Sequence, residues 1–123
     1  MGTEKNNRSE EDYIESILLL GEQLDFVHRV DVAKRMGVSQ AAVNKAVNLL
    51  LEKNYVYEEG KHLYLTPAGE KYARTVYEKH LVIRAFLKKM GVSEKSAEED
   101  ACKLEHIIGE ETFCMMKNHV EKD

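Results

Sequence analysis

The sequence predicts a mainly α-helical protein, with an N-terminal winged helix-turn-helix, a small β-hairpin wing and a C-terminal helical domain. Three observations lead to this expectation. Apolar residues recur at helical spacing through most of the 123 residues, two short helical patterns meet at a tight turn, and a short alternating segment follows them directly. The length also suits two small units, which we place at residues 1–70 and 71–123.

The first 52 residues predict three helices. The segment SEEDYIESILLLGE predicts a helix over residues 10–21, with Ser9 as its N-cap and Asp12 as the capping-box partner. A short helix then ends at Gly37, and Ser39 caps the next one. Its expected buried stripe is Ala42, Val43, Ala46, Val47, Leu50 and Leu51. Two short helices joined by the turn MGVS predict a helix-turn-helix.

The rest of the chain predicts a hairpin and three further helices. YVYEEGKHLYLT alternates and contains a turn at EGK, which is typical of a two-stranded wing. Thr66 and Pro67 then start a long helix, because proline suits the first helical position. A second MGVS ends that helix near Met90, and Ser93 caps a helix expected over residues 94–108. A last helix follows Gly109.

Composition and charge narrow the class of protein. No apolar run approaches the roughly 18 residues of a membrane span, no leader pattern is present, and two cysteines make no disulfide framework, so we expect a cytoplasmic protein. The net charge of −4 is unevenly distributed, because residues 1–27 carry −5, residues 28–90 carry +6 and residues 91–123 carry −5. A basic middle between acidic ends can hold a phosphate-facing surface and a cation-attracting surface.

The basic middle coincides with a set of side chains suited to reading DNA. In a winged helix-turn-helix the second helix enters the major groove, where Gln and Asn can pair with adenine and Lys can reach guanine. Nearby basic residues contact phosphates. The alternative is a polar surface that binds a protein partner. The candidate DNA-binding residues are Arg29, Lys34, Arg35, Ser39, Gln40, Ala41, Asn44, Lys45, Asn48 and Lys61.

A second set of side chains is suited to a metal. Cys102, Glu105 and His106 stand at i, i+3 and i+4, so on a helix they share one face. Each also has an ordinary explanation by itself: a lone cysteine is often a small core residue. Two further carboxylates stand one helical turn apart, and their alternative explanations are a helix cap and ordinary surface charge. A histidine is another possible donor, and its alternative explanation is a single satisfied hydrogen bond. These donors are Asp12, Glu15 and His80.

These motifs together resemble the diphtheria toxin repressor and manganese transport regulator family of metal-dependent repressors. The resemblance extends from about Glu11 to Thr112 and rests on EDYIESI, VDVAKRMGVSQAAVNKAVNLL, LYLTPAGEKYA, KHLVIRAFL and EEDACKLEH. It implies a divalent metal site between a DNA-binding unit and dimerisation helices. The implied ligands are Asp12, Glu15, His80, Cys102, Glu105 and His106.

The implied ligand set is a hybrid of two family types. Asp12 and Glu15 look like the manganese-type members, whereas Cys102 looks like the iron-type members. A thiolate softens the site, so we expect Fe²⁺ ahead of Mn²⁺. Arg84 and Glu98 stand where iron-type members have ancillary ligands, and the charge of Arg84 counts against a second cation.

The resemblance also implies a mechanism without catalysis. We expect a homodimer whose metal fixes the spacing of two reading heads on a palindromic DNA operator, and not an enzyme. A metal-independent or organic-ligand-responsive winged-helix regulator is the alternative. A small metalloenzyme is disfavoured, because no general base or substrate pocket is readable.

Overall fold

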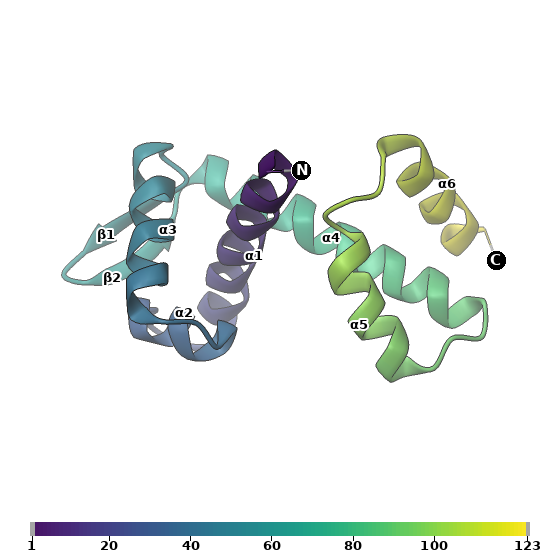
Figure 1. Cartoon of the computed structure of the whole chain (residues 1–123), viewed down its shortest axis with the longest axis horizontal. Coiled ribbons are helices and arrows are strands. Elements are labelled where there is room, and N and C mark those ends of the chain that lie inside the picture. Colours follow the sequence, from purple (N-terminus) through teal and green to yellow (C-terminus); the bar gives the residue numbers. More distant parts are fainter. Residues whose placement is uncertain (1, 123) are drawn as a thin grey trace. The chain divides into compact units, whose positions relative to one another are not determined.

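The computed structural model describes residues 2–122, with side chains from Glu10 onward. It confirms a mainly helical chain with one two-stranded antiparallel hairpin (Figure 1). The elements in chain order are α1 (Gly2–Gln23), α2 (Arg29–Met36), α3 (Gln40–Glu52), β1 (Val56–Glu59), β2 (His62–Leu65), α4 (Pro67–Lys89), α5 (Glu94–Leu104) and α6 (Glu110–Glu121). The chain divides into two compact units, Met1–Arg74 and Thr75–Asp123, and the division falls inside α4.

The first unit is a winged helix-turn-helix. Helix α1 contacts α2, α3 and β2, and α3 also contacts β1, so the three helices and the wing enclose one apolar core. The largest fully buried side chains of this unit are Ile14, Val32, Val43, Val47 and Leu50. The hairpin pairs Val56 with Leu65 and Glu59 with His62, which leaves a two-residue turn at Gly60 and Lys61.

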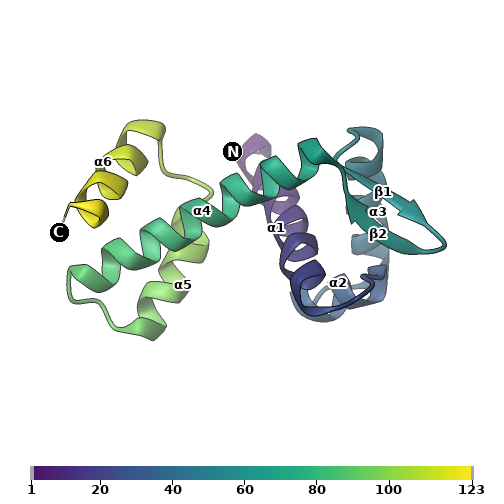
Figure 2. The same cartoon turned by 180° about the vertical axis from the view of Figure 1, so that it is seen from behind.

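The second unit is entirely helical within the described residues. Helices α5 and α6 lie beside the later part of α4 (Figure 2). Lys117 on α6 donates to Glu78 on α4 at 3.0 Å, and Phe86 and His119 make an edge-to-face ring contact. Its core is smaller than that of the first unit, with Phe113 as its one buried aromatic side chain among the described residues.

The tetrapeptide MGVS forms the turn before α3. Gly37 has φ 65°, in the left-handed region, and the Val38 N–H donates to the Ala33 carbonyl at 3.2 Å. The Ser39 hydroxyl then accepts from the Ala42 N–H at 3.1 Å, which caps α3 as predicted.

The second MGVS forms a similar turn before α5. Gly91 has φ 102°, and the Val92 N–H donates to the Leu87 carbonyl at 3.0 Å. The Ser93 hydroxyl accepts from the Ser96 N–H at 3.3 Å, and this predicted cap is also confirmed.

Helix α4 starts against the base of the wing. Thr66 accepts from the Gly69 N–H at 3.0 Å through its hydroxyl, and Pro67 is the first helical residue, as the sequence predicts. Gly69 packs directly on the backbone of Tyr55. A Cβ at this position would overlap the Tyr55 carbonyl oxygen, so only glycine fits here.

Three local predictions are wrong. Helix α1 begins at Gly2, so Ser9 lies inside it and does not cap it, since no proline interrupts the preceding residues. Helix α5 ends at Leu104 because the following bonds tighten to i→i−3, as from the Ile107 N–H to the Leu104 carbonyl at 3.1 Å. Ala42 is exposed, since at about 100° per residue it lies at the edge of the stripe centred on Val43 and Val47.

Across residues 2–122, every helix is too short or too polar to cross a bilayer.

Candidate nucleic-acid interface and metal centre

Helix α3 turns a polar face outward because its apolar face is fully used in the core. Val43, Val47 and Leu50 are buried, so the polar residues Asn44, Lys45 and Asn48 between them point away from the core. Lys34 and Arg35 in the last turn of α2, and Lys61 in the wing, are exposed as well. The exposed predicted residues are Lys34, Arg35, Ser39, Gln40, Ala41, Asn44, Lys45, Asn48 and Lys61.

Arg29 differs from the other predicted DNA-binding residues because it is engaged inside the unit. Its guanidinium donates to both carboxylate oxygens of Glu58 on the wing, from Nε and Nη2 at 2.8 Å each. Nη1 also donates to Asn44 Oδ1 and Nη2 to Asn48 Oδ1, both at 3.2 Å. The side chains of Arg29 and Glu58 are only 20% and 26% exposed. Arg29 therefore links the start of α2, the outer face of α3 and the wing.

This pair is held in its charged form. The hydrogen bond from Arg29 lowers the pKa of Glu58, although partial burial acts in the opposite direction. The same hydrogen bond raises the pKa of Arg29. Both groups are ionised at neutral pH, so Arg29 has a fixed anionic partner before any phosphate approaches.

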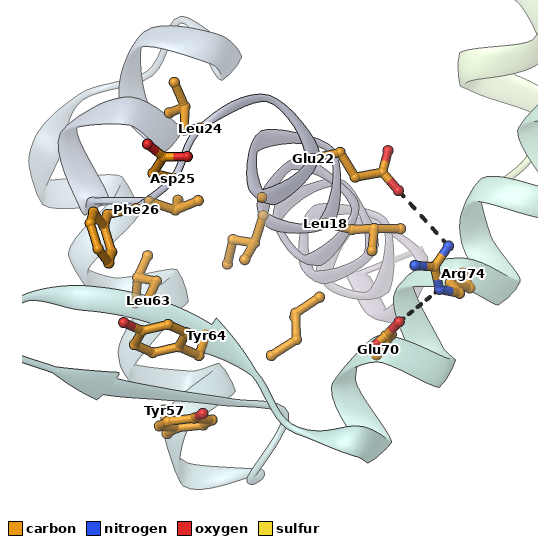
Figure 3. A pocket seen from close by; sticks show the side chains of 14 residues that line it. Leu18, Glu22, Leu24, Asp25, Phe26, Tyr57, Leu63, Tyr64, Glu70 and Arg74 are labelled. Atoms are coloured by element: carbon orange, nitrogen blue, oxygen red, sulfur yellow. Dashed lines mark hydrogen bonds and ion pairs between the residues drawn. The ribbon is translucent and has the colours of Figure 1, made fainter.

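A hollow of about 300 Å³ lies elsewhere in the first unit, between α1, the wing and the start of α4 (Figure 3). Phe26, Tyr57 and Tyr64 contribute aromatic surface to it. Arg74 lies at its edge between two carboxylates, 2.9 Å from Glu70 and 3.9 Å from Glu22. Because the charge of Arg74 is already balanced, the hollow indicates no particular class of ligand.

The second unit gathers metal-ligand side chains around His80, which lies on α4. His80 is 7% exposed, and its two ring nitrogens face different carboxylates. Nδ1 lies 2.8 Å from Glu105 Oε1, and Nε2 lies 3.0 Å from Glu98 Oε2. The hydrogen bond with Glu105 raises the pKa of His80, although burial acts against it.

Cys102 and Glu98 extend this group from α5, where they stand one helical turn apart. The Cys102 Sγ lies 3.8 Å from His80 Nδ1 and 3.9 Å from Glu98 Oε2. One donor atom from each of His80, Glu98 and Cys102 lies within 4.8 Å of the other two. Cys102 is exposed, so its explanation as a core residue is wrong.

Glu105 and His106 follow directly after α5. The turn that ends the helix keeps both residues beside it, and their side chains are each 1% exposed. His106 Nε2 lies 3.3 Å from Glu105 Oε2, while Glu105 Oε1 faces His80. The second unit therefore brings together four of the six predicted ligands: His80, Cys102, Glu105 and His106.

The donor set fits a divalent cation. The buried carboxylate of Glu105 and the half-exposed one of Glu98 face the same imidazole, and a divalent cation bound among them would offset their negative charge. Imidazole, carboxylate and thiolate are the donors that Fe²⁺, Co²⁺ and Zn²⁺ share, and carboxylates also suit Mn²⁺.

Asp12 and Glu15 lie on α1 in the first unit. They stand three positions apart (i and i+3), so they share one side of the helix, and both are partly buried. Asp12 is well inside α1, which excludes its predicted role in an N-terminal capping box.

Glu98 is a candidate ligand that the sequence reasoning did not select. Arg84 counted against a cation at this place, but its Nη1 donates to Glu98 Oε1 at 3.1 Å, so its charge is compensated. Arg84 and His80 together lower the pKa of Glu98 against the effect of burial. The feature of the sequence that indicates Glu98 as a ligand is its spacing from Cys102 at i and i+4, which places both residues on one helical face.

Two family models cover almost the whole chain. Residues 7–63 match the N-terminal DNA binding domain of iron dependent repressors, and residues 66–122 match their metal binding and dimerisation domain. The chain belongs to the iron-dependent repressor family. The resemblance deduced from its motifs is thereby confirmed, and the two matched domains correspond to the winged helix-turn-helix and to the helices that carry His80 and Cys102.

Individual members of the family are similar in sequence and in structure. The transcriptional regulator MntR of Salmonella typhimurium is 36% identical over 104 residues, which are 84% of this chain and 66% of the relative. An HTH-type transcriptional regulator of Methanocaldococcus jannaschii is 34% identical over 119 residues and matches 94% of this chain and 95% of its own length. The solved structure of the manganese regulator SloR is 27% identical, with a TM-score of 0.80, and covers 93% of this chain.

The chain spans about two thirds of the length of the Salmonella regulator and 54% of SloR. Membership of the chain in the iron-dependent repressor family therefore rests on the two domains that it contains.

Proposed function

We propose that this protein is a metal-dependent transcriptional repressor that binds a palindromic DNA operator as a cytoplasmic homodimer. The observation that carries the proposal is the presence, in one short chain, of an outward polar face on α3 and a donor cluster around His80. The family supports it, since its two domains bind DNA and combine metal binding with dimerisation.

The proposed metal ligands come from both units. His80, Cys102, Glu105 and His106 would hold the ion in the second unit, with Glu98 as a further donor. Asp12 and Glu15 on α1 would complete its coordination from the DNA-binding unit. A cation shared in this way would restrict the position of the reading head, which is the coupling that a metal-controlled repressor needs.

The required coupling is small. A free energy of about 1–3 kcal/mol between metal and DNA binding changes operator affinity by roughly 5 to 150-fold. Ligands contributed by two elements of one protein can supply this amount, because the ion binds well only to the arrangement that brings them together.

We propose Fe²⁺ as the preferred ion, with Mn²⁺ next. Two similar solved structures are of the manganese regulator SloR and the manganese-activated repressor ScaR, which fits the carboxylate-rich part of the set. The thiolate of Cys102 favours Fe²⁺, because sulfur is a softer donor than a carboxylate oxygen. Cys102 is therefore the residue on which the choice of metal most depends.

The test is an anaerobic DNA-binding titration of the full chain with Fe²⁺, Mn²⁺ and Zn²⁺. The DNA is a duplex selected from a random library by the metal-loaded protein, and the metal content and mass of the protein are measured in the same samples. The proposal expects a metal-dependent rise in affinity, two chains per operator, and the largest rise with Fe²⁺.

Two substitutions separate this function from its alternative. Glu105→Ala and His106→Ala should abolish the response to metal, whereas Glu110→Ala, which removes an exposed carboxylate nearby, should retain it. Operator binding that is the same with and without every metal would contradict metal control. It would favour a metal-independent or organic-ligand-responsive regulator.

A further inference from the structure

The outer face of α3 carries a hydrogen-bond arrangement that bears on which base it reads. Asn44 Oδ1 accepts two hydrogen bonds at 3.2 Å, one from Arg29 Nη1 and one from Gln40 Nε2. An amide oxygen has two lone pairs, so this oxygen has no further capacity to accept. The orientation of the amide is well defined, because a guanidinium can only donate and must face the oxygen.

The amide nitrogen of Asn44 is consequently the atom of this side chain that can still hydrogen-bond to a base. Asparagine reads adenine by accepting from N6 and donating to N7, which needs both amide atoms. With its oxygen occupied, Asn44 can only donate. In the major groove guanine presents two acceptors, N7 and O6, and these suit the two N–H groups of one amide.

Glu58 keeps this arrangement in place. It lies on the wing, and its two oxygens hold Arg29 at 2.8 Å, so the guanidinium cannot leave Asn44 for a phosphate without breaking a bidentate ion pair. Its neighbour Glu59 differs, because it is exposed and its side chain points to the opposite face of the strand.

We propose that the Arg29–Glu58 pair sets the base preference of α3 by holding Asn44 as a hydrogen-bond donor, so that Asn44 selects guanine instead of adenine. The inference rests on the proposed function, and it alters the adenine pairing expected from the sequence at this position. Glu58 is then a positioning residue on the wing that controls specificity without contacting a base.

The experiment is selection of random duplex DNA by the full chain, with Fe²⁺ under anaerobic conditions and with Mn²⁺ in parallel. Asn44→Ala identifies the base position that depends on Asn44, because the preference there disappears. The unsubstituted protein should prefer guanine over adenine at that position by about 5 to 150-fold, the discrimination of one good base contact.

The matched pair of variants is Glu58→Gln and Glu59→Gln, which remove the same charge from adjacent residues of the wing. Glu58→Gln should lose the guanine preference or shift it to adenine, and Glu59→Gln should keep it. Arg29→Met is a second route, since it removes the guanidinium and frees one lone pair of Asn44. Thermal unfolding of each variant identifies any that does not fold.

The outcomes are distinct. A wild-type preference for adenine at the position that depends on Asn44, or an unchanged guanine preference in both Glu58→Gln and Arg29→Met, overturns the inference and leaves the repressor function intact. Failure of the unsubstituted protein to enrich any sequence with either metal overturns the proposed function, and this inference with it.

Discussion

The tetrapeptide MGVS occurs at residues 36–39 and again at residues 90–93, and it forms closely related turns in two different settings. In both, a glycine with positive φ ends one helix and a serine caps the next. The helices that follow have little else in common. Helix α3 buries Val43, Val47 and Leu50, whereas α5 buries only Ala97 and Ala101.

This difference separates what the turn residues determine from what the residues of the following helix determine. The four local residues determine the turn, because glycine provides the left-handed backbone and serine the cap. The side chains after the turn determine what the helix does. Large apolar residues anchor α3 in the core, whereas α5 buries only two alanines and carries the donors Glu98 and Cys102.

The largest test concerns the anchoring of α3. Leu50 is 1% exposed, so Leu50→Ala should lower the free energy of unfolding by about 2–5 kcal/mol, through lost burial and a residual cavity. Leu49 is the matched control, because it is 47% exposed and Leu49→Ala should change stability by at most about 0.5 kcal/mol. Urea unfolding followed by circular dichroism measures both, and equal losses would contradict the assigned face.

The next test concerns the donors on α5. With free Fe²⁺ at 100 times its dissociation constant, metal binding should stabilise the chain by about 2.7 kcal/mol. If Cys102→Ala weakens binding 100-fold, the gain at the same concentration falls to about 0.4 kcal/mol. Cys114→Ala removes the other exposed cysteine and should retain the full gain. Anaerobic thermal unfolding with and without Fe²⁺ distinguishes them, and equal gains in the two variants would exclude Cys102 as a ligand.

The two turns themselves should differ in their sensitivity to alanine. A Cβ would meet no neighbour at Gly37 or Gly91, so only the backbone matters. Gly37 has φ 65°, which L residues tolerate at a cost of about 1 kcal/mol, and Gly91 has φ 102°, beyond that region. We expect Gly91→Ala to cost about 2 kcal/mol. A larger loss in Gly37→Ala, measured by urea unfolding, would show that the turns differ in another way.

The smallest test uses pH and applies only to the face of α3. The pKa of Glu58 in the folded protein lies below its ordinary value of 4.5, so its ion pair contributes stability above pH 4.5. That contribution is lost as the pH falls through the folded-state pKa. The stability difference between wild type and Glu58→Gln should be about 1 kcal/mol at pH 7 and should shrink toward pH 3. Glu59→Gln should show no such trend, and a gap that widens in acid would contradict the sign.

The parts of the fold that depend on near neighbours could be predicted from the sequence. Gly37 and Ser39, the alternating segment of the wing, and Thr66 before Pro67 all act within a few residues, and the structure contains each feature. The predicted ends of α1 and α5 were less accurate. Helix ends depend on weak hydrogen bonds whose loss costs little, as in the turn after Leu104.

The candidate sites were only partly predictable, for a related reason. Cys102, Glu105 and His106 were predicted to share one helical face, but α5 ends at Leu104, so Glu105 and His106 lie beyond the helix that carries Cys102. Cys102 lies beside His80 and Glu98, and Glu105 lies between His80 and His106. The pairing of Arg84 with Glu98 and of Arg29 with Glu58 joins residues that are 14 and 29 positions apart. Such contacts depend on how the elements pack. The charge of Arg84 counts against a cation site when only the sequence is considered, but in the fold it is neutralised by Glu98.

The contact between Gly69 and Tyr55 gives a way to interpret the sequences of other winged proteins of this kind. Because Gly69 has no side chain, the first turn of α4 can pack directly against the backbone of Tyr55, which leads into the wing. A related chain with a larger residue at this place must carry its wing at another angle. The wing residues of such a chain should therefore not be aligned with Glu58 position by position, even when its α3 sequence is identical.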